Sequence, residues 1–145
     1  MIRRLLGLLA AGALLSSCGS QSASSALSSW VALSNFHDSV SVLTSDARHA
    51  VNVLKNSSAT SNQLHTVCAV LLVDAESANA SLPSPDDQAT LLLSRAYDKL
   101  GAGANECYVA ASSTPTRTRA LRALEAAGAL LSEATARVGA IDSPG

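Results

Sequence analysis

Aromatic side chains are scarce in this 145-residue sequence, which has one tryptophan, one phenylalanine and two tyrosines. Because strands favour bulky aromatic and β-branched residues, this scarcity argues against a β-sheet protein. Alanine, serine and leucine are abundant instead, and alanine and leucine are good helix formers. The composition therefore predicts a helical protein whose small side chains let helices approach one another closely.

The sequence also lacks a surplus of charge of either sign, with 10 basic and 11 acidic side chains and a formal net charge of -1. Without Arg3 and Arg4, which lie near the N-terminus, 8 basic side chains remain against 11 acidic ones, and the net charge is -3. Proteins that bind nucleic acids present a strongly basic surface. We therefore expect no nucleic-acid partner.

The apolar run at the N-terminus is too short to cross a membrane. It covers residues 5–15, which is 11 residues, whereas a transmembrane helix needs about 20. Two arginines precede the run, and two serines followed by Cys18 come after it. This is the layout of a secretory signal peptide, with small residues at its cleavage site.

The four residues Leu15-Ser16-Ser17-Cys18 resemble the lipobox of bacterial lipoproteins, in which an aliphatic and two small residues precede a cysteine. The resemblance implies that residues 1–17 are a signal peptide and that Cys18 becomes a lipidated N-terminus carrying acyl chains such as palmitate. Two or three acyl chains make a lasting membrane anchor. The resemblance thus implies export and attachment to the outer face of the cell membrane, or to the outer membrane in a Gram-negative source. The alternative is an ordinary secreted protein that is cut nearby.

A looser pattern covers about half of the remaining chain. It consists of an early tryptophan at position 30, the segment 68–74 that begins with Cys68, the segment 82–86, and Cys107. The pattern is similar to that of small helical lipoproteins and secreted proteins of high-GC Gram-positive bacteria. It implies no particular activity.

Apolar residues recur at steps of three and four along most of the chain after Cys18, which predicts amphipathic helices. In the first of them, the stripe runs from Leu33 through Leu43 to Leu54. Four such helices with short connections favour an all-α, antiparallel four-helix bundle over residues 26–142, preceded by a flexible tether at residues 18–25. We expect the helices at residues 26–55, after Ser61 as N-cap, after Ser84 as N-cap with Pro85 at the first helical position, and from Thr114-Pro115 onwards.

Export makes a disulfide possible, and Cys68 and Cys107 are the pair that remains once Cys18 is lipidated. A hairpin folded symmetrically about residues 83 and 84 leaves Cys107 about 10 Å beyond Cys68. A disulfide needs α-carbons within about 7 Å. We therefore expect the pair to form, with helix tilt or a bend at residues 101–103 closing the gap.

Candidate metal and catalytic residues are few. His65 and Cys68 are three residues apart on one expected helix, a spacing that can hold zinc or copper, but a disulfide removes the sulfur ligand. We expect His37 to be a partly buried neighbour of Trp30 and Phe36. Because no serine stands in a recognisable arrangement with a histidine and an acid, we expect no metal, no cofactor, no catalytic residue and no enzymatic activity.

Arg117, Arg119 and Arg122 gather at the start of the last expected helix, where the helix dipole disfavours cations. They either contact anionic lipid headgroups or an acidic partner, or lie on a solvated face. Of these alternatives, we expect the solvated face.

The pattern as a whole favours a lipid-anchored, non-catalytic interaction or accessory protein of the cell envelope, docked on an envelope protein partner. The alternative is a carrier of a small apolar ligand in a cavity between helices. A carrier requires an apolar pocket among four leucines, whereas an accessory protein requires a filled core and an exposed apolar patch. The four leucines are Leu93, Leu100, Leu124 and Leu131.

Overall fold

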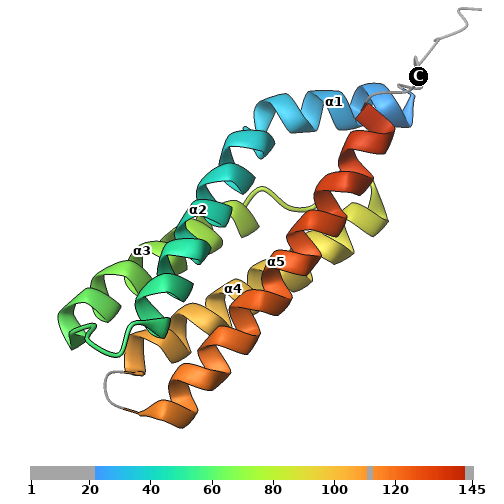
Figure 1. The fold of residues 1–145 in the computed structure, drawn as a ribbon. Helices are drawn as coiled ribbons and strands as arrows, with labels where there is room; N and C mark the ends of the chain where they lie inside the picture. The colour runs from blue at the N-terminus through green and yellow to red at the C-terminus, as the bar shows by residue number, and fades with distance from the viewer. Residues whose placement is uncertain (1–21, 111–112, 143–145) are drawn as a thin grey trace, which may run out of the picture.

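The computed structural model describes residues 22–110 and 113–142, which form a bundle of α-helices (Figure 1). Helices α2 to α5 lie side by side and alternate in direction, while the short α1 crosses one end. The predicted all-α antiparallel four-helix bundle is confirmed, with one additional short helix. The helices are α1 (Ala23–Leu33), α2 (Phe36–Lys55), α3 (Ser61–Asn79), α4 (Asp87–Val109) and α5 (Thr114–Asp142).

A break at Ser34 and Asn35 separates α1 from α2. Asn35 has φ 51° and ψ 41°, in the left-handed region that asparagine tolerates better than most residues. The chain turns there, so the prediction of one helix over residues 26–55 is wrong. Leu33, which the apolar stripe placed on the buried face, is 89% exposed because α1 ends at this residue.

The N-terminus of α1 lies within the segment that was expected to be a tether. Ser22 caps the helix, because its hydroxyl accepts a hydrogen bond from the N–H of Ser25 at 3.2 Å. Residues 23–25 therefore belong to the helix and not to the tether. The rest of the predicted tether, residues 18–21, lies outside the described residues.

Helix α1 closes one end of the bundle by packing on α5 and α2. Its buried side chains are Leu27 and Val31. The indole N–H of Trp30 donates to the carbonyl of Ser81 at 2.9 Å, which ties α1 to the connection between α3 and α4. Trp30 also lies against Phe36, with ring centroids 5.3 Å apart.

Two N-caps differ from those predicted. Thr60, not Ser61, caps α3 and forms a capping box with Gln63. Asp86, not Ser84, caps α4, because a carboxylate two residues further on takes the position that we assigned to the serine. Ser84 is buried instead and takes part in the connection that precedes the helix.

Cys68 of α3 and Cys107 of α4 form a disulfide, as predicted, with α-carbons 5.8 Å apart. Cys68 lies 11 residues before the end of α3 and Cys107 lies 20 residues after the start of α4, a difference of about 14 Å along a helix. The extended connection at residues 80–86 runs onward from α3 before α4 turns back (Figure 1). This connection, and not a bend at residues 101–103, brings the cysteines level.

Two of the three arginines at the start of α5 have hydrogen-bond partners on neighbouring helices. Arg117 donates to the carbonyls of Leu54 and Asn56 at 3.3 and 3.1 Å, at the C-terminal end of α2. Arg119 donates to both carboxylate oxygens of Glu106 near the C-terminal end of α4, at 3.1 and 3.0 Å. Because the bundle is antiparallel, these cations lie beside the electron-rich ends of neighbouring helices, which offsets their unfavourable place on α5.

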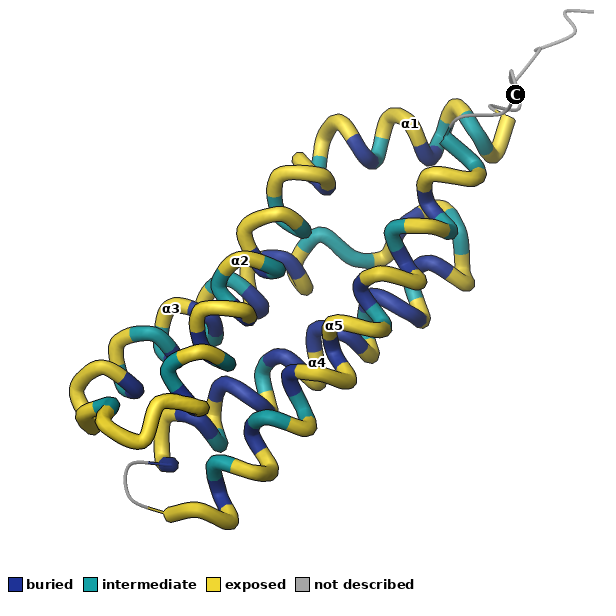
Figure 2. Tube along the Cα trace, in the orientation of Figure 1, coloured by how far each residue is buried: buried dark blue, intermediate teal, exposed yellow. Residues whose placement is uncertain are grey.

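Buried side chains line the inner faces of the helices and form one core (Figure 2). Leucine and alanine predominate in it, as the composition predicts. Its largest fully buried side chains are Leu27, Leu43, Leu64, Leu71, Leu93, Leu100, Val138, Cys68 and Cys107.

Candidate functional site

A groove of about 830 Å³ opens on the surface between α2 and α5. This volume falls within the range of about 300 to 1,000 Å³ that is typical of small-molecule sites. Most of the surface that lines the groove is apolar. The lining residues are Val40, Thr44, Ala47, Arg48, Val51, Asn52, Leu124, Glu125, Gly128, Leu131, Ser132, Thr135 and Ala136.

Small residues and uneven helix packing keep the groove open. Gly103 lets α4 approach α5 closely, because a Cβ on Gly103 would lie 2.7 Å from Cδ2 of Leu124. Toward α2 the facing side chains are short, among them Ala47 and Ala136, and a Cβ on Gly128 would meet nothing within 4 Å. Helix α5 therefore packs tightly on α4, and the groove remains on the side of α5 that faces α2.

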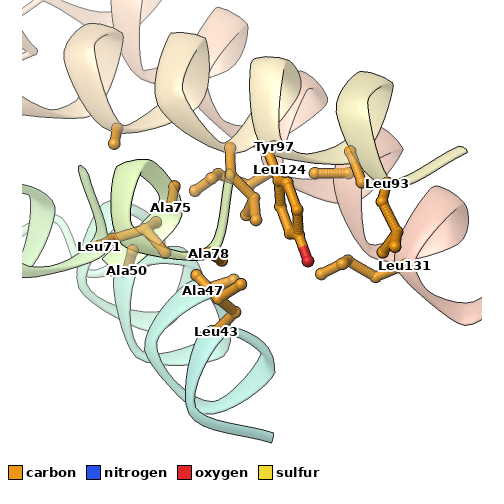
Figure 3. Close-up of a cluster of buried hydrophobic side chains, with 14 of the residues drawn as sticks. Leu43, Ala47, Ala50, Leu71, Ala75, Ala78, Leu93, Tyr97, Leu124 and Leu131 are labelled. Carbon is orange, nitrogen blue, oxygen red and sulfur yellow. The ribbon is translucent and has the colours of Figure 1, made fainter. Parts of the chain in front are cut away.

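The floor of the groove belongs to the hydrophobic core. Ala47, Leu124 and Leu131 line it and are buried. Figure 3 shows these three residues around Tyr97 of α4, whose hydroxyl is directed toward Leu131. Burial raises the pKa of Tyr97 to about 12, so this hydroxyl stays neutral at physiological pH.

A shallow, largely open surface region of about 710 Å³ runs along the exposed face of α2 and adjoins the groove. We call it the polar hollow because most of its lining residues are polar. The groove and the hollow are both lined by Thr44, Arg48 and Asn52. Beyond this shared border the hollow is lined by Ser41, Ser45, His49, Val53 and Asn56. Helix α2 thus presents an apolar surface on one side of Arg48 and a hydrogen-bonding surface on the other.

Of the two charged residues that line the groove, Glu125 has an oppositely charged partner among the described residues and Arg48 does not. Glu125 of α5 lies 3.9 Å from the ammonium of Lys55 on α2, across one end of the groove. The salt bridges found among residues 22–110 and 113–142 do not include Arg48. Arg48 is therefore a cation at the edge of an apolar surface with no acidic partner in the described part of the chain.

Asp46 is the acidic residue closest to Arg48 in sequence on α2, and it interacts with Asp74 of α3. Burial raises the pKa of Asp46, and a hydrogen bond with the Asp74 carboxyl raises it further. Asp46 therefore belongs to the contact between α2 and α3, whereas Arg48 lines the groove beside α5.

Two of the four leucines that we predicted around a cavity line the groove, and two do not. Leu124 and Leu131 form part of its floor, whereas Leu93 and Leu100 are fully buried in the core. Sequence reasoning missed the contribution of α2. On α5 the available signal was Gly128, a small residue between Leu124 and Leu131 in the sequence.

The histidine and cysteine candidates are occupied by other contacts. His65 stacks on Tyr108 with ring centroids 4.4 Å apart, and Cys68 is in the disulfide. His37 lies edge-on to Phe36, with centroids 5.5 Å apart, as predicted, but it is exposed and not partly buried. Within the described ranges, no three histidine, cysteine, aspartate or glutamate side chains gather as metal ligands would.

Cys18, the predicted lipidation site, lies outside the described residues. None of the helices in the described part of the chain is long and apolar enough to span a bilayer. Comparison of the chain with protein-family models, curated protein sequences and solved structures finds no match. The groove and the N-terminal sequence pattern are therefore the observations that bear on function.

Proposed function

We propose that this chain is an exported, non-catalytic binding protein of the cell envelope that is anchored by lipid on Cys18 and carries a small apolar ligand. The groove between α2 and α5 is the observation that supports the carrier role. It has the volume of a ligand site, a buried apolar floor and a few polar groups at its border, which is the usual composition of such sites. For this reason we place the carrier role ahead of the accessory role that the sequence alone favours.

The accessory role is the second candidate, and exposed valines on α3 favour it. Val70 and Val73 are 49% and 62% exposed. They are three residues apart on one helix and therefore lie on the same side of it. Such a surface suits a protein partner in the envelope.

A fluorescence assay tests the carrier role. A neutral apolar dye that brightens in apolar surroundings, such as N-phenyl-1-naphthylamine, is titrated into the chain carrying Cys18→Ser, purified without detergent. We expect saturable binding that Gly128→Leu abolishes, because the new side chain fills the groove. Gly139→Leu is the matched control, since Gly139 is also an exposed α5 glycine with open space around it but does not line the groove.

Either of two results contradicts the carrier role. One is the absence of saturable dye binding to the folded protein. The other is equal loss, or equal retention, of binding in Gly128→Leu and Gly139→Leu, which would place the dye elsewhere. Circular dichroism of both variants shows that the helices remain intact.

Membrane fractionation with intact-mass analysis tests the anchor separately. We expect the chain that starts at Cys18 to carry acyl groups and to sediment with membranes, because two or three acyl chains hold a protein at a bilayer. Cys18→Ala should release the protein or block its processing. Unchanged processing and membrane attachment in Cys18→Ala would overturn the anchor and leave the carrier role standing.

A further inference from the structure

The apolar groove and the polar hollow meet along one edge of α2, and this arrangement restricts the chemistry of a ligand. Thr44, Arg48 and Asn52 line both. A purely apolar ligand uses only the groove, and a purely polar one uses only the hollow. A molecule with an apolar tail and a polar head uses both at once.

From this arrangement we infer that the ligand is a medium-chain fatty acid, with its tail in the α2–α5 groove and its carboxylate at Arg48. The inference rests on the proposed carrier function and names its ligand class. Arg48 is the charged residue at the border between groove and hollow that lacks a salt bridge with the described residues. A guanidinium offers two parallel N–H donors to one carboxylate, which favours this head group over an alcohol or an ester.

The other charges near the groove are consistent with an anionic head at Arg48. Glu125 is engaged by Lys55 at 3.9 Å and lies on the opposite wall. Asp46 interacts with Asp74 of α3. Asn52 adds an amide donor on the turn after Arg48, since residues four apart lie on the same side of a helix.

The length of the groove fits a single acyl chain. Its lining extends from Val40 to Asn52 on α2 and from Leu124 to Ala136 on α5, which is about 18 Å on each helix. A chain whose carboxylate lies at Arg48 has the eight-residue stretch back to Val40 available, which is about 12 Å. With carbon–carbon bonds of about 1.5 Å, an extended chain advances roughly 1.3 Å per methylene, so about nine carbons fill this part of the groove.

Isothermal titration calorimetry of the Cys18→Ser chain with saturated fatty acids, from butanoate to stearate, tests the inference. We expect affinity to rise by at most about fourfold per methylene and to level off at about nine carbons, where the groove ends beyond Val40. Arg48→Gln should weaken binding of the acid about tenfold and leave binding of its methyl ester unchanged. Arg95→Gln, which removes an exposed arginine on α4 that does not line the groove, should change neither.

The outcomes separate this inference from the proposed function. If acid and ester bind equally, or if Arg48→Gln and Arg95→Gln behave alike, the carboxylate assignment is overturned, whereas dye binding that Gly128→Leu blocks still supports a carrier. If no fatty acid binds and sedimentation shows a dimer that Gly128→Leu separates, a second copy of the chain covers the groove and the inference is also overturned.

Discussion

The guanidinium of Arg137 binds both carboxylate oxygens of Asp86, with nitrogen–oxygen distances of 2.8 and 3.1 Å, across 51 residues of sequence. The same carboxylate accepts the N–H of Ala89 at 2.7 Å and thereby caps α4. One side chain thus begins α4 and fastens it to α5. The hydrogen bond with Arg137 holds the pKa of Asp86 below its usual value.

Substitution of Asp86 should separate these two roles. Asp86→Ala removes the cap and the ion pair, and we expect it to lower the free energy of unfolding by about 2 kcal/mol, of which a cap accounts for about 1 kcal/mol. Asp86→Asn keeps an oxygen acceptor for the cap and loses only the ion pair, so we expect about half that loss. Urea unfolding measures both, and equal losses in the two variants would show that the cap contributes nothing.

The lowered pKa of Asp86 also predicts an acid dependence. Because the folded-state pKa lies below the unfolded value near 3.8, its contribution to stability is present above about pH 4 and is lost as the pH falls through the folded pKa. Arg137→Gln should reduce this loss on acidification. Parallel acid-unfolding curves for the parent chain and Arg137→Gln would contradict the pairing.

Two glycines on α4 should respond to alanine in opposite directions. A Cβ on Gly103 would lie 2.7 Å from Cδ2 and 2.9 Å from Cγ of Leu124. We expect Gly103→Ala to cost about 1 kcal/mol net, because overpacking outweighs the gain in helix propensity. A Cβ on Gly101 has only Cδ1 of Leu72 near it, at 3.9 Å, so Gly101→Ala should stabilise by about 0.5–1 kcal/mol. Shifts of equal sign in chemical denaturation would contradict the close contact between α4 and α5.

Removal of the disulfide should destabilise the bundle substantially. Cys68 and Cys107 are separated by 39 residues, and a loop of that length corresponds to about 4 kcal/mol in the chain-entropy estimate. We expect the Cys68→Ala, Cys107→Ala double variant to lose a large part of that amount in urea unfolding, measured in a Cys18→Ser background. Both sulfurs are buried, so thiol reagents should label the parent chain only after denaturation and reduction. Rapid labelling of the native protein would contradict the bond.

The helical content could be predicted because it rests on local pattern. Apolar spacing and composition are enough to define amphipathic helices. The cysteine pair could be predicted because only two cysteines remain once Cys18 is set aside. The break at Asn35 was missed because the apolar stripe continues past it. Leu33 is exposed because the chain turns at Asn35, so that α1 is not a straight continuation of α2.

The groove could be predicted less well than the fold, because it depends on how far apart two helices lie. Leu124 and Leu131 were among the four leucines predicted around a carrier's pocket, and both line the groove. The border formed by Arg48 and Asn52 did not, since both appear in the sequence as ordinary polar residues of an exposed face. Which helix approaches α5 closely depends on the contact at Gly103, and that contact involves two distant segments.

Tyr97 predicts a measurable loss of stability in alkali. Burial raises its pKa from 10.0 to about 12. Between pH 10 and 12 the phenol is therefore neutral in the folded chain and ionised in the unfolded chain. This difference lowers the free energy of unfolding by up to about 3 kcal/mol over that range. Its contribution to stability is intact below pH 10 and declines as the pH rises toward the folded pKa.

Urea unfolding between pH 8 and 11.5 measures this effect as the difference between variants, which cancels the titration of other groups. Tyr97→Phe has no phenol to ionise, so we expect its stability to decline less steeply above pH 10 than that of the parent chain. Tyr108→Phe is the control because Tyr108 is 45% exposed, and we expect it to follow the parent curve. If Tyr97→Phe and Tyr108→Phe decline alike, the phenol of Tyr97 is reached by water, and the floor of the groove is more open than its packing against Leu131 indicates.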